Sequence, residues 1–395
     1  MLLTFNAGSS TVKIGLFELK AIGPRRVAKA VIDFQKEPLN FRITEGPSNY
    51  NVPLEARASD DLAPVIAEAF SWLTKHFDMN TVVAVGHRLV HGGDVFSGPV
   101  VLDDATIAAI DKLTMLAPLH QPQSLRLIQA IRQLKPDTPQ LASFDTAFHG
   151  TNADVVRRFA IPRVFFDEGV KRYGFHGLSY KFIARALERY TPSVARGKVV
   201  AAHLGSGASL CALENGQSRD TSMGFSTLDG IPMATRCGAL DPGVLLHLLG
   251  AGGKSLGEVE DVLYHKSGLL GVSGISADSR ALLAANEPEA REAIDLFTFR
   301  IAGEIARLTA TLGGIQAIVF TAGIGENQPL IREKICDRLG WLGVKLDTAA
   351  NEANAERISA LLSRVSVFII PTDEEQVIAD EAVFVLNSKM PRSDP

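Results

Sequence analysis

Hydrophobic and polar positions at the start of the chain follow the pattern of paired strands. Residues 2–5 form an apolar run that ends at the sequence NAGSS, and alternation resumes at Val12, Ile14 and Leu16. An apolar run, a turn rich in glycine and serine, and a second alternating run predict a strand–turn–strand hairpin. Similar runs predict two further strands, at 27–34 and 39–44.

The hydrophobic period then changes to that of a helix. Apolar side chains recur every three or four residues across 61–76, which predicts a helix there with Ser59 or Asp60 as its N-cap. A buried strand is expected at 81–85, ending at the sequence Gly86-His87-Arg88, and another at 140–144, ending at Asp145. Between them the pattern predicts helices near 103–114 and 123–134.

The same order of elements then begins again. The opening hairpin is repeated by a strand at 198–203, the turn GSGAS and a strand in ASLCAL. A second turn follows at Asn215-Gly216. Aligning the two hairpins places Gly8 opposite Gly205, about half a chain length apart. Later segments predict a helix near 290–312, strands at 315–321 and 366–370, and a last helix at about 375–387. Strands mixed with helices throughout give an α/β fold class, and the repeat suggests two similar halves.

Composition narrows the class of protein. The chain has 395 residues and a net charge of −4, without the strong basic stripe of a nucleic-acid-binding protein. It contains no apolar run of the roughly 18 residues that a membrane helix needs, and no signal peptide pattern. Three widely spaced cysteines form neither a disulfide framework nor a zinc motif. We therefore expect a cytoplasmic enzyme that binds neither nucleic acid nor membrane.

Three glycine-rich loops suggest phosphate binding. The loops NAGSSTVK, GSGAS and AGIGEN each follow a strand, and glycine lets backbone N–H groups approach an anion closely. Lys13 adds a positive charge beside the first loop. Each loop alone is more typical of a plain turn, whereas three together favour a nucleotide. The chain has neither the P-loop pattern nor a GxGxxG that opens a helix.

Charged side chains at strand ends and in loops are the next candidates. Arg88 and Asp145 follow predicted strands, and ligands of open α/β sheets bind at the carboxyl ends of strands. Arg236, in TRCGALDPG, suits carboxylate or phosphate binding. His176, between two glycines in RYGFHGLS, is the best ligand-facing histidine, while most other histidines fit hydrogen-bonded core positions. Glu374, in PTDEE, fits either a helix N-terminus or a water-mediated Mg²⁺ site.

Nine motifs in order resemble the acetate kinase family, which also includes propionate and butyrate kinases. The resemblance covers nearly the whole chain, because the segments at its two ends, NAGSSTVK and PTDEEQVIADE, also match the family. The motifs are GHRLVHGG, LAPLHQP, FDTAFH, RYGFHG, HLGSG, TSMGF, TRCG, SGLLGVSG and FTAGIGEN.

The resemblance implies a fold and an activity. The fold is a duplicated actin-like, ribonuclease H-like ATPase fold, with two domains around a nucleotide cleft. We expect an N-terminal domain of residues 1–148 plus 377–395, and a C-terminal domain of residues 149–376 that carries nucleotide loops and a dimer interface. The implied activity is reversible transfer of the ATP γ-phosphate to acetate, giving acetyl phosphate and ADP, by a homodimer that uses Mg²⁺ or, in its place, Mn²⁺.

The resemblance also implies a role for each matching residue. Asn6 and Glu374 would lie on the magnesium side. Arg88, Asp145, His176 and Arg236 would form the catalytic set, with Arg88 also binding substrate. The acyl pocket would consist of Val90, Leu119 and Phe175. The nucleotide contacts would be Lys13, His203, Leu204, Gly205, Ser206, Gly207, Asp278, Ser279, Arg280, Gly323, Ile324, Gly325, Glu326 and Asn327.

Several positions depart from the family pattern. Ser206 replaces an asparagine of the nucleotide loop, Ser279 is smaller than usual, and Thr227 stands where a proline is usual near the acyl pocket. In the motif after His176, Leu178 and Tyr180 replace the usual threonine and histidine. None removes a charged catalytic group. A branched Val90 keeps the pocket small and favours acetate. Propionate or butyrate kinase activity remains an alternative, as does a nucleotide-binding regulator without catalysis.

Overall fold

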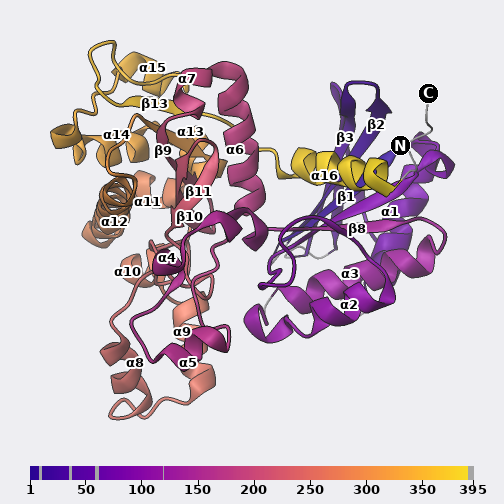
Figure 1. Ribbon diagram of the computed structural model, residues 1–395, viewed down its shortest axis with the longest axis horizontal. Coiled ribbons are helices and arrows are strands. Elements are labelled where there is room, and N and C mark those ends of the chain that lie inside the picture. The colour runs from indigo at the N-terminus through magenta and orange to yellow at the C-terminus, as the bar shows by residue number, and fades with distance from the viewer. Residues whose placement is uncertain (9–10, 35–37, 58–61, 119, 390–395) are drawn as a thin grey trace. The chain divides into compact units, whose positions relative to one another are not determined.

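The computed structural model describes residues 1–8, 11–34, 38–57, 62–118 and 120–389. The chain divides into two compact units (Figure 1). Unit 1 comprises Met1–Phe148 and Asp373–Pro395, and unit 2 comprises His149–Thr372. The predicted caps Ser59 and Asp60 and the predicted pocket residue Leu119 lie outside the described residues.

Unit 1 is built on an eight-stranded sheet with the order β5-β4-β3-β2-β1-β6-β8-β7. Its strands are β1 (Leu2–Ala7), β2 (Thr11–Lys20), β3 (Gly23–Asp33), β4 (Asn40–Glu45), β5 (Ser48–Pro53), β6 (Ala84–Leu89), β7 (Val100–Val101) and β8 (Gln140–Phe144). Its helices are α1 (Ala63–His76), α2 (Asp104–Asp111), α3 (Gln121–Leu134) and α16 (Glu374–Lys389).

The two faces of this sheet are buried by different helices. Because successive side chains of a strand point to opposite faces, Leu3 and Phe5 of β1 pack in one apolar cluster with α1 and α3. Leu2 packs in a second cluster, against Ala379 and Ala382 of α16. The C-terminal helix therefore completes the N-terminal unit, because without it one face of the sheet would be left uncovered (yellow in Figure 1).

Unit 2 is built on a five-stranded sheet with the order β11-β10-β9-β12-β13. Its strands are β9 (Lys198–Leu204), β10 (Ala208–Glu214), β11 (Gln217–Thr221), β12 (Ala317–Thr321) and β13 (Ser366–Ile369). Its helices are α4 (Asp154–Arg157), α5 (Arg163–Asp167), α6 (Gly177–Tyr190), α7 (Pro192–Ala195), α8 (Pro242–Leu249), α9 (Leu256–His265), α10 (Gly268–Ser273), α11 (Ser279–Ala284), α12 (Pro288–Leu312), α13 (Ala322–Asn327), α14 (Pro329–Asp337) and α15 (Thr348–Glu352). Figure 1 shows α6 and α12 on opposite sides of this sheet.

The two sheets contain the same five-strand core. In unit 1, β3, β2 and β1 are antiparallel neighbours, and β6 and β8 continue parallel to β1. In unit 2, β11, β10 and β9 are antiparallel neighbours, and β12 and β13 continue parallel to β9. This shared order confirms the duplication inferred from the two hairpins. The fold is the duplicated α/β architecture that the family resemblance implies.

Two predicted segments differ from the structure. The strand expected at 81–85 is β6, which starts at Ala84 because residues 79–81 form a short 3₁₀ helix capped by the Asp78 carboxylate. The AGIGEN segment, expected as a turn, is the short helix α13. Its first residue, Ala322, has a φ of +63°, a left-handed conformation that is strained for a residue with a Cβ.

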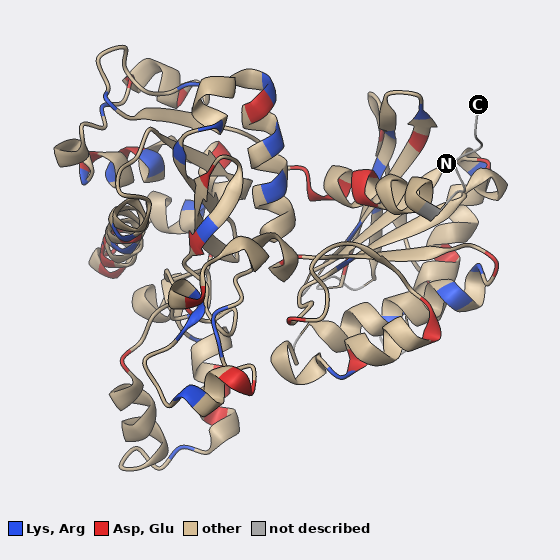
Figure 2. Cartoon of the chain, in the orientation of Figure 1, with Lys and Arg blue, Asp and Glu red and all other residues tan. Residues whose placement is uncertain are grey.

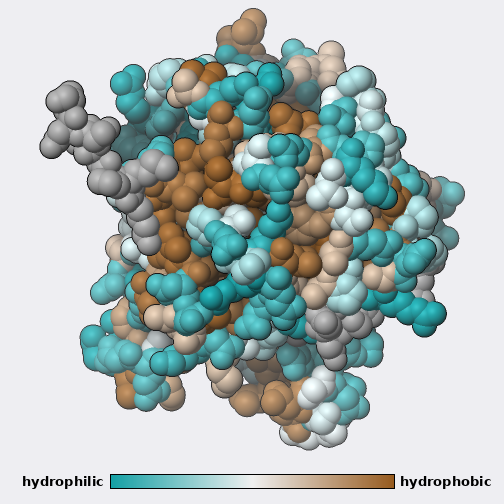
Figure 3. Space-filling view, turned by 90° about the vertical axis from the view of Figure 1, so that its right-hand side faces the viewer, coloured by the Kyte–Doolittle hydropathy of each residue, from teal (hydrophilic) through white to brown (hydrophobic). Residues whose placement is uncertain are grey.

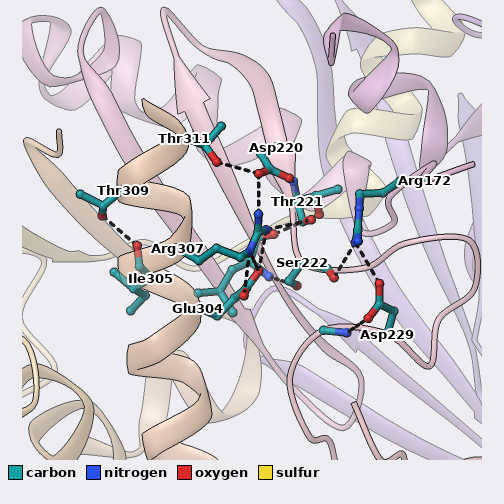
Figure 4. A network of polar contacts seen from close by, with 12 residues as sticks. Arg172, Asp220, Thr221, Ser222, Asp229, Glu304, Ile305, Arg307, Thr309 and Thr311 are labelled. Atoms are coloured by element: carbon teal, nitrogen blue, oxygen red, sulfur yellow. Dashed lines mark hydrogen bonds and ion pairs between the residues drawn. The ribbon is translucent and has the colours of Figure 1, made fainter. Parts of the chain in front are cut away.

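A polar network anchors the long helix α12 to β11 (Figure 4). The Arg307 guanidinium donates to Asp220 at 2.7 Å and to Glu304 at 2.8 Å, and the Thr311 hydroxyl donates to the same Asp220 oxygen at 2.9 Å. Burial alone would lower the pKa of Arg307, but the two carboxylates raise it above its ordinary value. The nearly buried Asp220 is thus compensated by a cation that stays charged.

Acidic and basic residues are interspersed over both units (Figure 2). Figure 3 looks onto unit 1, where hydrophobic areas are divided by polar ones. In the described residues, no helix is both long and apolar enough to cross a membrane.

Candidate active site

The predicted residues of unit 1 meet at one edge of its sheet. Strands β1, β6 and β8 run parallel, so their carboxyl ends bring Asn6, Arg88 and Asp145 together. Arg88 donates from Nη2 and Nε to Oδ2 of Asp145, at 2.6 and 3.0 Å, and from Nη1 to Oδ1 of Asn6 at 3.1 Å. Lys13 lies opposite Asn6 in the β1–β2 ladder, with an exposed side chain.

The start of α16 adds two carboxylates to this group. The Asn6 amide donates to Oε2 of Glu374 at 2.7 Å and to Oε1 of Glu375 at 2.8 Å. Arg26 of β3 forms an ion pair with Asp373 and so fixes the beginning of the helix. Burial alone would lower the pKa of Arg88, but Asp145, Glu374 and Glu375 together raise it above its ordinary value. Arg88 therefore stays cationic although its side chain is only 13% exposed.

The predicted residues of unit 2 surround the loop between β9 and β10. His176 precedes α6 with a φ of +56°, and its ring stacks on that of His203, with ring centroids 4.2 Å apart. A Cβ added to Gly207 would lie 3.5 Å from Nε2 of His176 and 3.8 Å from Nη1 of Arg236. The imidazole and the guanidinium thus both reach the backbone of this glycine loop.

Arg236 is a partly buried cation without a carboxylate partner in the part of the chain that the structure describes. Its Nη1 donates to the Thr227 carbonyl oxygen at 3.4 Å and lies 4.0 Å from Sδ of Met233. Burial lowers the pKa of Arg236. Gly268 allows the surrounding turn to close, because its φ is +62° and a Cβ there would lie 2.1 Å from the Met233 carbonyl oxygen. An uncompensated guanidinium held in this way is suited to bind an anion.

The other predicted nucleotide residues occupy two neighbouring segments. The Asp278 carboxylate caps α11 and pairs with Arg280 at 2.6 Å, which lowers the pKa of Asp278. The Ser279 hydroxyl accepts from Nε2 of Gln328 at 2.7 Å. In α13, Oε1 of Glu326 accepts from the Ala322 amide at 2.7 Å. This bond holds the strained start of the helix.

Two predicted acyl-pocket residues are described, and both are buried. Val90 follows β6 in unit 1 and is 3% exposed, whereas Phe175 precedes His176 in unit 2 and is 2% exposed. The Phe175 carbonyl oxygen is hydrogen-bonded to Nε2 of His149 at 2.9 Å. Burial lowers the pKa of His149 to about 4, so it is a neutral core histidine at pH 7.

The structure also shows residues to which the sequence analysis assigned no role in the site. Ser209 and Tyr180 adjoin His176, and the buried Arg332 donates to the Gly325 carbonyl oxygen at 3.0 Å. Tyr180 lies four residues after His176, a spacing that places both on one face of a helix and was a usable signal. Arg332 gave no such signal, because its partners Asn351 and Asn354 lie about 20 residues further along the chain.

Comparison with known proteins now identifies the family. The sequence matches the Acetokinase family over residues 1–380. The chain belongs to the acetokinase family. This confirms the resemblance drawn from the nine motifs.

Named relatives match over nearly the full length. Acetate kinase of Methylocella silvestris is 46% identical over 397 residues, covering 98% of each chain. Acetate kinase of Rhodopseudomonas palustris is 46% identical over 386 residues, covering 96% of each. Among solved structures, a propionate kinase from Francisella tularensis superposes with a TM-score of 0.89 at 32% identity, covering 96% of this chain and 98% of that one. Porphyromonas gingivalis acetate kinase gives 0.86 at 33% identity, covering 98% and 99%. These acetokinases support the duplicated fold.

Proposed function

We propose that the chain catalyses reversible transfer of the γ-phosphoryl group of ATP to acetate, giving acetyl phosphate and ADP. The observation that carries this proposal is Arg236, a partly buried cation whose charge is not balanced by a carboxylate among the described residues. It lies with His176 beside Gly207. A glycine loop with a free cation and an imidazole suits a phosphoryl group. The relatives named acetate kinase support acetate as the acceptor.

The reaction needs positioning more than acid–base chemistry. A carboxylic acid is already ionised at pH 7, so no base has to remove a proton from the acceptor. One acetate oxygen forms a bond to the γ-phosphorus, and the bond from that phosphorus to the bridging oxygen breaks with its electron pair staying on ADP. The main obstacle is repulsion between two anions. We assign Arg88 and Arg236 to offset it, and Nε2 of His176 to donate a hydrogen bond to the phosphoryl oxygens.

We assign Asp145 to orienting Arg88. Its carboxylate is fully buried and binds Nε and Nη2 of that guanidinium, which leaves Nη1 directed at Asn6. Lys13, the 203–207 loop, residues 278–280 and the 323–327 loop are proposed as nucleotide contacts. Acetate would lie against Val90, Leu119 and Phe175.

The donor set beside Asn6 fits Mg²⁺. Carboxylate and amide oxygens are hard ligands, and Mg²⁺ is usually held by one or two protein carboxylates together with water and substrate phosphates. Glu374, Glu375 and Asn6 supply such oxygens within one hydrogen-bonded group. In the described residues, no cluster of three or more His, Cys, Asp or Glu side chains forms a complete metal cage. We propose that Asn6 and Glu374 hold Mg²⁺ or Mn²⁺, which when bound neutralises charge on the nucleotide phosphates.

A second copy of the chain is the proposed partner. Helix α8 buries none of its residues, and Val244, Leu246 and Leu249 are 39, 72 and 42% exposed. We propose this exposed apolar face as part of the dimer interface in the C-terminal domain. Sedimentation equilibrium should give a dimer for the wild type and a monomer for Leu246→Asp; a wild-type monomer at micromolar concentration would contradict the proposal. The three free cysteines suit the expected cytoplasmic location.

Acyl-hydroxamate formation with ATP and Mg²⁺ tests the proposed activity. We expect kcat/KM to be highest with acetate. A higher kcat/KM with propionate or butyrate would show that this longer acid, and not acetate, is the preferred substrate. Arg236→Ala and His176→Ala should each lower kcat at least about 100-fold. Arg300→Ala, which removes an exposed arginine of the same unit, is the control and should retain activity. Wild-type turnover in both active-site variants would overturn the mechanism. Nucleotide binding without any turnover of the wild type would favour a regulator.

A further inference from the structure

Two side chains hold the imidazole of His176 in one orientation. His203 of β9 stacks on the ring at an interplanar angle of 14°. Oγ of Ser209 in β10 lies 2.8 Å from Nδ1. Ser209 is the direct ladder partner of His203 across the β9–β10 pair, so one strand pair supplies both contacts. The stack and the hydrogen bond together restrict rotation of the ring about both of its side-chain torsions.

A second hydrogen bond connects Ser209 to Tyr180. The Tyr180 hydroxyl lies 2.5 Å from the same Ser209 oxygen, and neither side chain has any solvent exposure. Tyr180 stands one helical turn after His176, so that α6 itself brings the phenol back toward the imidazole. His203 is held in a similar way, because its Nδ1 lies 2.8 Å from the hydroxyl of Ser179 on the same helix.

The opposite ring nitrogen of His176 faces the glycine loop. Nε2 is the imidazole atom that a Cβ on Gly207 would approach most closely, at 3.5 Å, with Nη1 of Arg236 close by. Nδ1 is therefore used to fix the ring, and Nε2 is directed at the side where we place the phosphoryl group. Only one of the two neutral tautomers then carries a proton at Nε2.

We propose that Tyr180 and Ser209 are positioning residues that hold His176 in its Nε2–H tautomer. The phenol O–H donates to Oγ of Ser209, and the Ser209 O–H donates to Nδ1 of His176, which leaves the single imidazole proton on Nε2. Donation in this direction presents a hydrogen-bond donor to the phosphoryl group in every turnover. The proposal rests on the proposed function for its catalytic consequence, but not for the tautomer itself.

Tyr180 is one of the positions at which this chain departs from its family pattern, where a histidine is usual. A phenol carries its proton at all pH values well below about 10, and it has one O–H to donate. A neutral histidine at the same place donates toward Ser209 only in one of its own tautomers. The tyrosine therefore has an O–H available to donate to Ser209 throughout the neutral pH range.

Activity measurements on Tyr180→Phe test the catalytic consequence. The variant keeps the ring and loses the donor, and we expect kcat to fall about 10- to 100-fold with KM for both substrates within about twofold. Tyr190→Phe, on the exposed end of the same helix, is the matched control and should behave as wild type. In a His176→Gln background, Tyr180→Phe should have no further effect on kcat, because it acts through that imidazole.

NMR of histidine-labelled protein tests the tautomer without any turnover. The His176 signal, assigned by its loss in His176→Gln, should show the Nε2–H tautomer in the wild type and a mixture of tautomers in Tyr180→Phe. Ser209→Ala should give the same mixture of tautomers, and it replaces Tyr180→Phe in the test if that variant does not fold. An Nδ1–H tautomer in the wild type, or unchanged tautomer and kcat in the variants, would overturn the proposal. A wild type that shows the Nε2–H tautomer but does not phosphorylate acetate would refute the proposed function alone.

Discussion

The buried histidines predict a steep loss of stability on acidification, and His87 allows this to be measured in one unit. His87 lies in β6 with its ring stacked on Phe5 and Nε2 hydrogen-bonded to Oε1 of Gln140 at 2.7 Å. Burial lowers the pKa of His87 from 6.5 to about 4, and the bond to Gln140 offsets only part of this. Nδ1 of His87 and Nε2 of Gln140 are buried without a partner in the described structure.

The size and sign of the effect follow from proton linkage. Between pH 6.5 and about 4 the unfolded chain binds a proton at His87 and the folded chain does not, so the free energy of unfolding falls as the pH falls through this window. A shift of this size corresponds to about 3 kcal/mol, lost at no more than about 1.4 kcal/mol per pH unit. Burial lowers the pKa of His91 in the same unit to about 4 as well. Unit 1 should therefore lose up to about 2.7 kcal/mol per pH unit from the two residues.

Urea unfolding followed by tryptophan fluorescence isolates unit 1. The chain has two tryptophans, and Trp341→Phe leaves Trp72 of α1 as the reporter. In that background, His87→Phe/Gln140→Leu replaces the buried polar pair by an apolar one, which can be close to neutral at pH 7.5. Between pH 6.5 and 5 its unfolding free energy should depend on pH about half as steeply as that of the parent.

Two controls make this result decisive. His87→Phe alone leaves Oε1 of Gln140 unpaired and should cost about 1–3 kcal/mol at pH 7.5, most of which the double variant recovers. Lys75→Gln changes an exposed side chain of the same unit and should keep the parent slope. If the double variant keeps the full slope, His87 is not held neutral in the folded unit and the reasoning fails.

Three further predictions follow from single contacts. Gly207→Ala places a methyl group at ordinary contact distance from the side chains of His176 and Arg236, so thermal unfolding should be almost unchanged while kcat/KM falls at least about 10-fold. Gly303→Ala, with no atoms near the added Cβ, is the control, and full activity of Gly207→Ala would contradict the assigned phosphoryl position. Asp145→Ala leaves buried Arg88 without its main counter-charge and should destabilise unit 1 by about 3–5 kcal/mol in urea unfolding, whereas a loss below about 1 kcal/mol would show that the pair is not needed. Arg332→Met leaves several buried acceptors unpaired and should lower unit 2 stability by about 3 kcal/mol or more, measured by calorimetry; an unchanged melting temperature would refute it.

The sequence alone was enough to predict most of the local helices and strands and the protein family, because both can be recognised from short sequence patterns. Alternation over a few residues marked the hairpins, and a glycine–serine turn marked where each one reverses. The rule that ligands gather at the carboxyl ends of parallel strands was enough to single out Arg88 and Asp145 before any contact was known. The sequence predicted the ends of the elements less accurately than their presence. Strand β6, for example, starts at Ala84 because that residue pairs with Leu2 of β1.

The tertiary structure alone decided which of these groups touch and in what state they are. Asn6 meets Glu374 although 368 residues separate them, because α16 covers the face of the sheet to which Asn6 points. Arg88 has a carboxylate partner, whereas Arg236 has none among the described residues. This difference depends on neighbours that sequence spacing does not reveal. The orientation of His176 is likewise fixed by Ser209, which belongs to a strand 33 residues away. Sequence patterns name the chemical groups within reach of each backbone element, whereas desolvation and hydrogen-bond partners, which set charge and orientation, exist only once distant elements have packed.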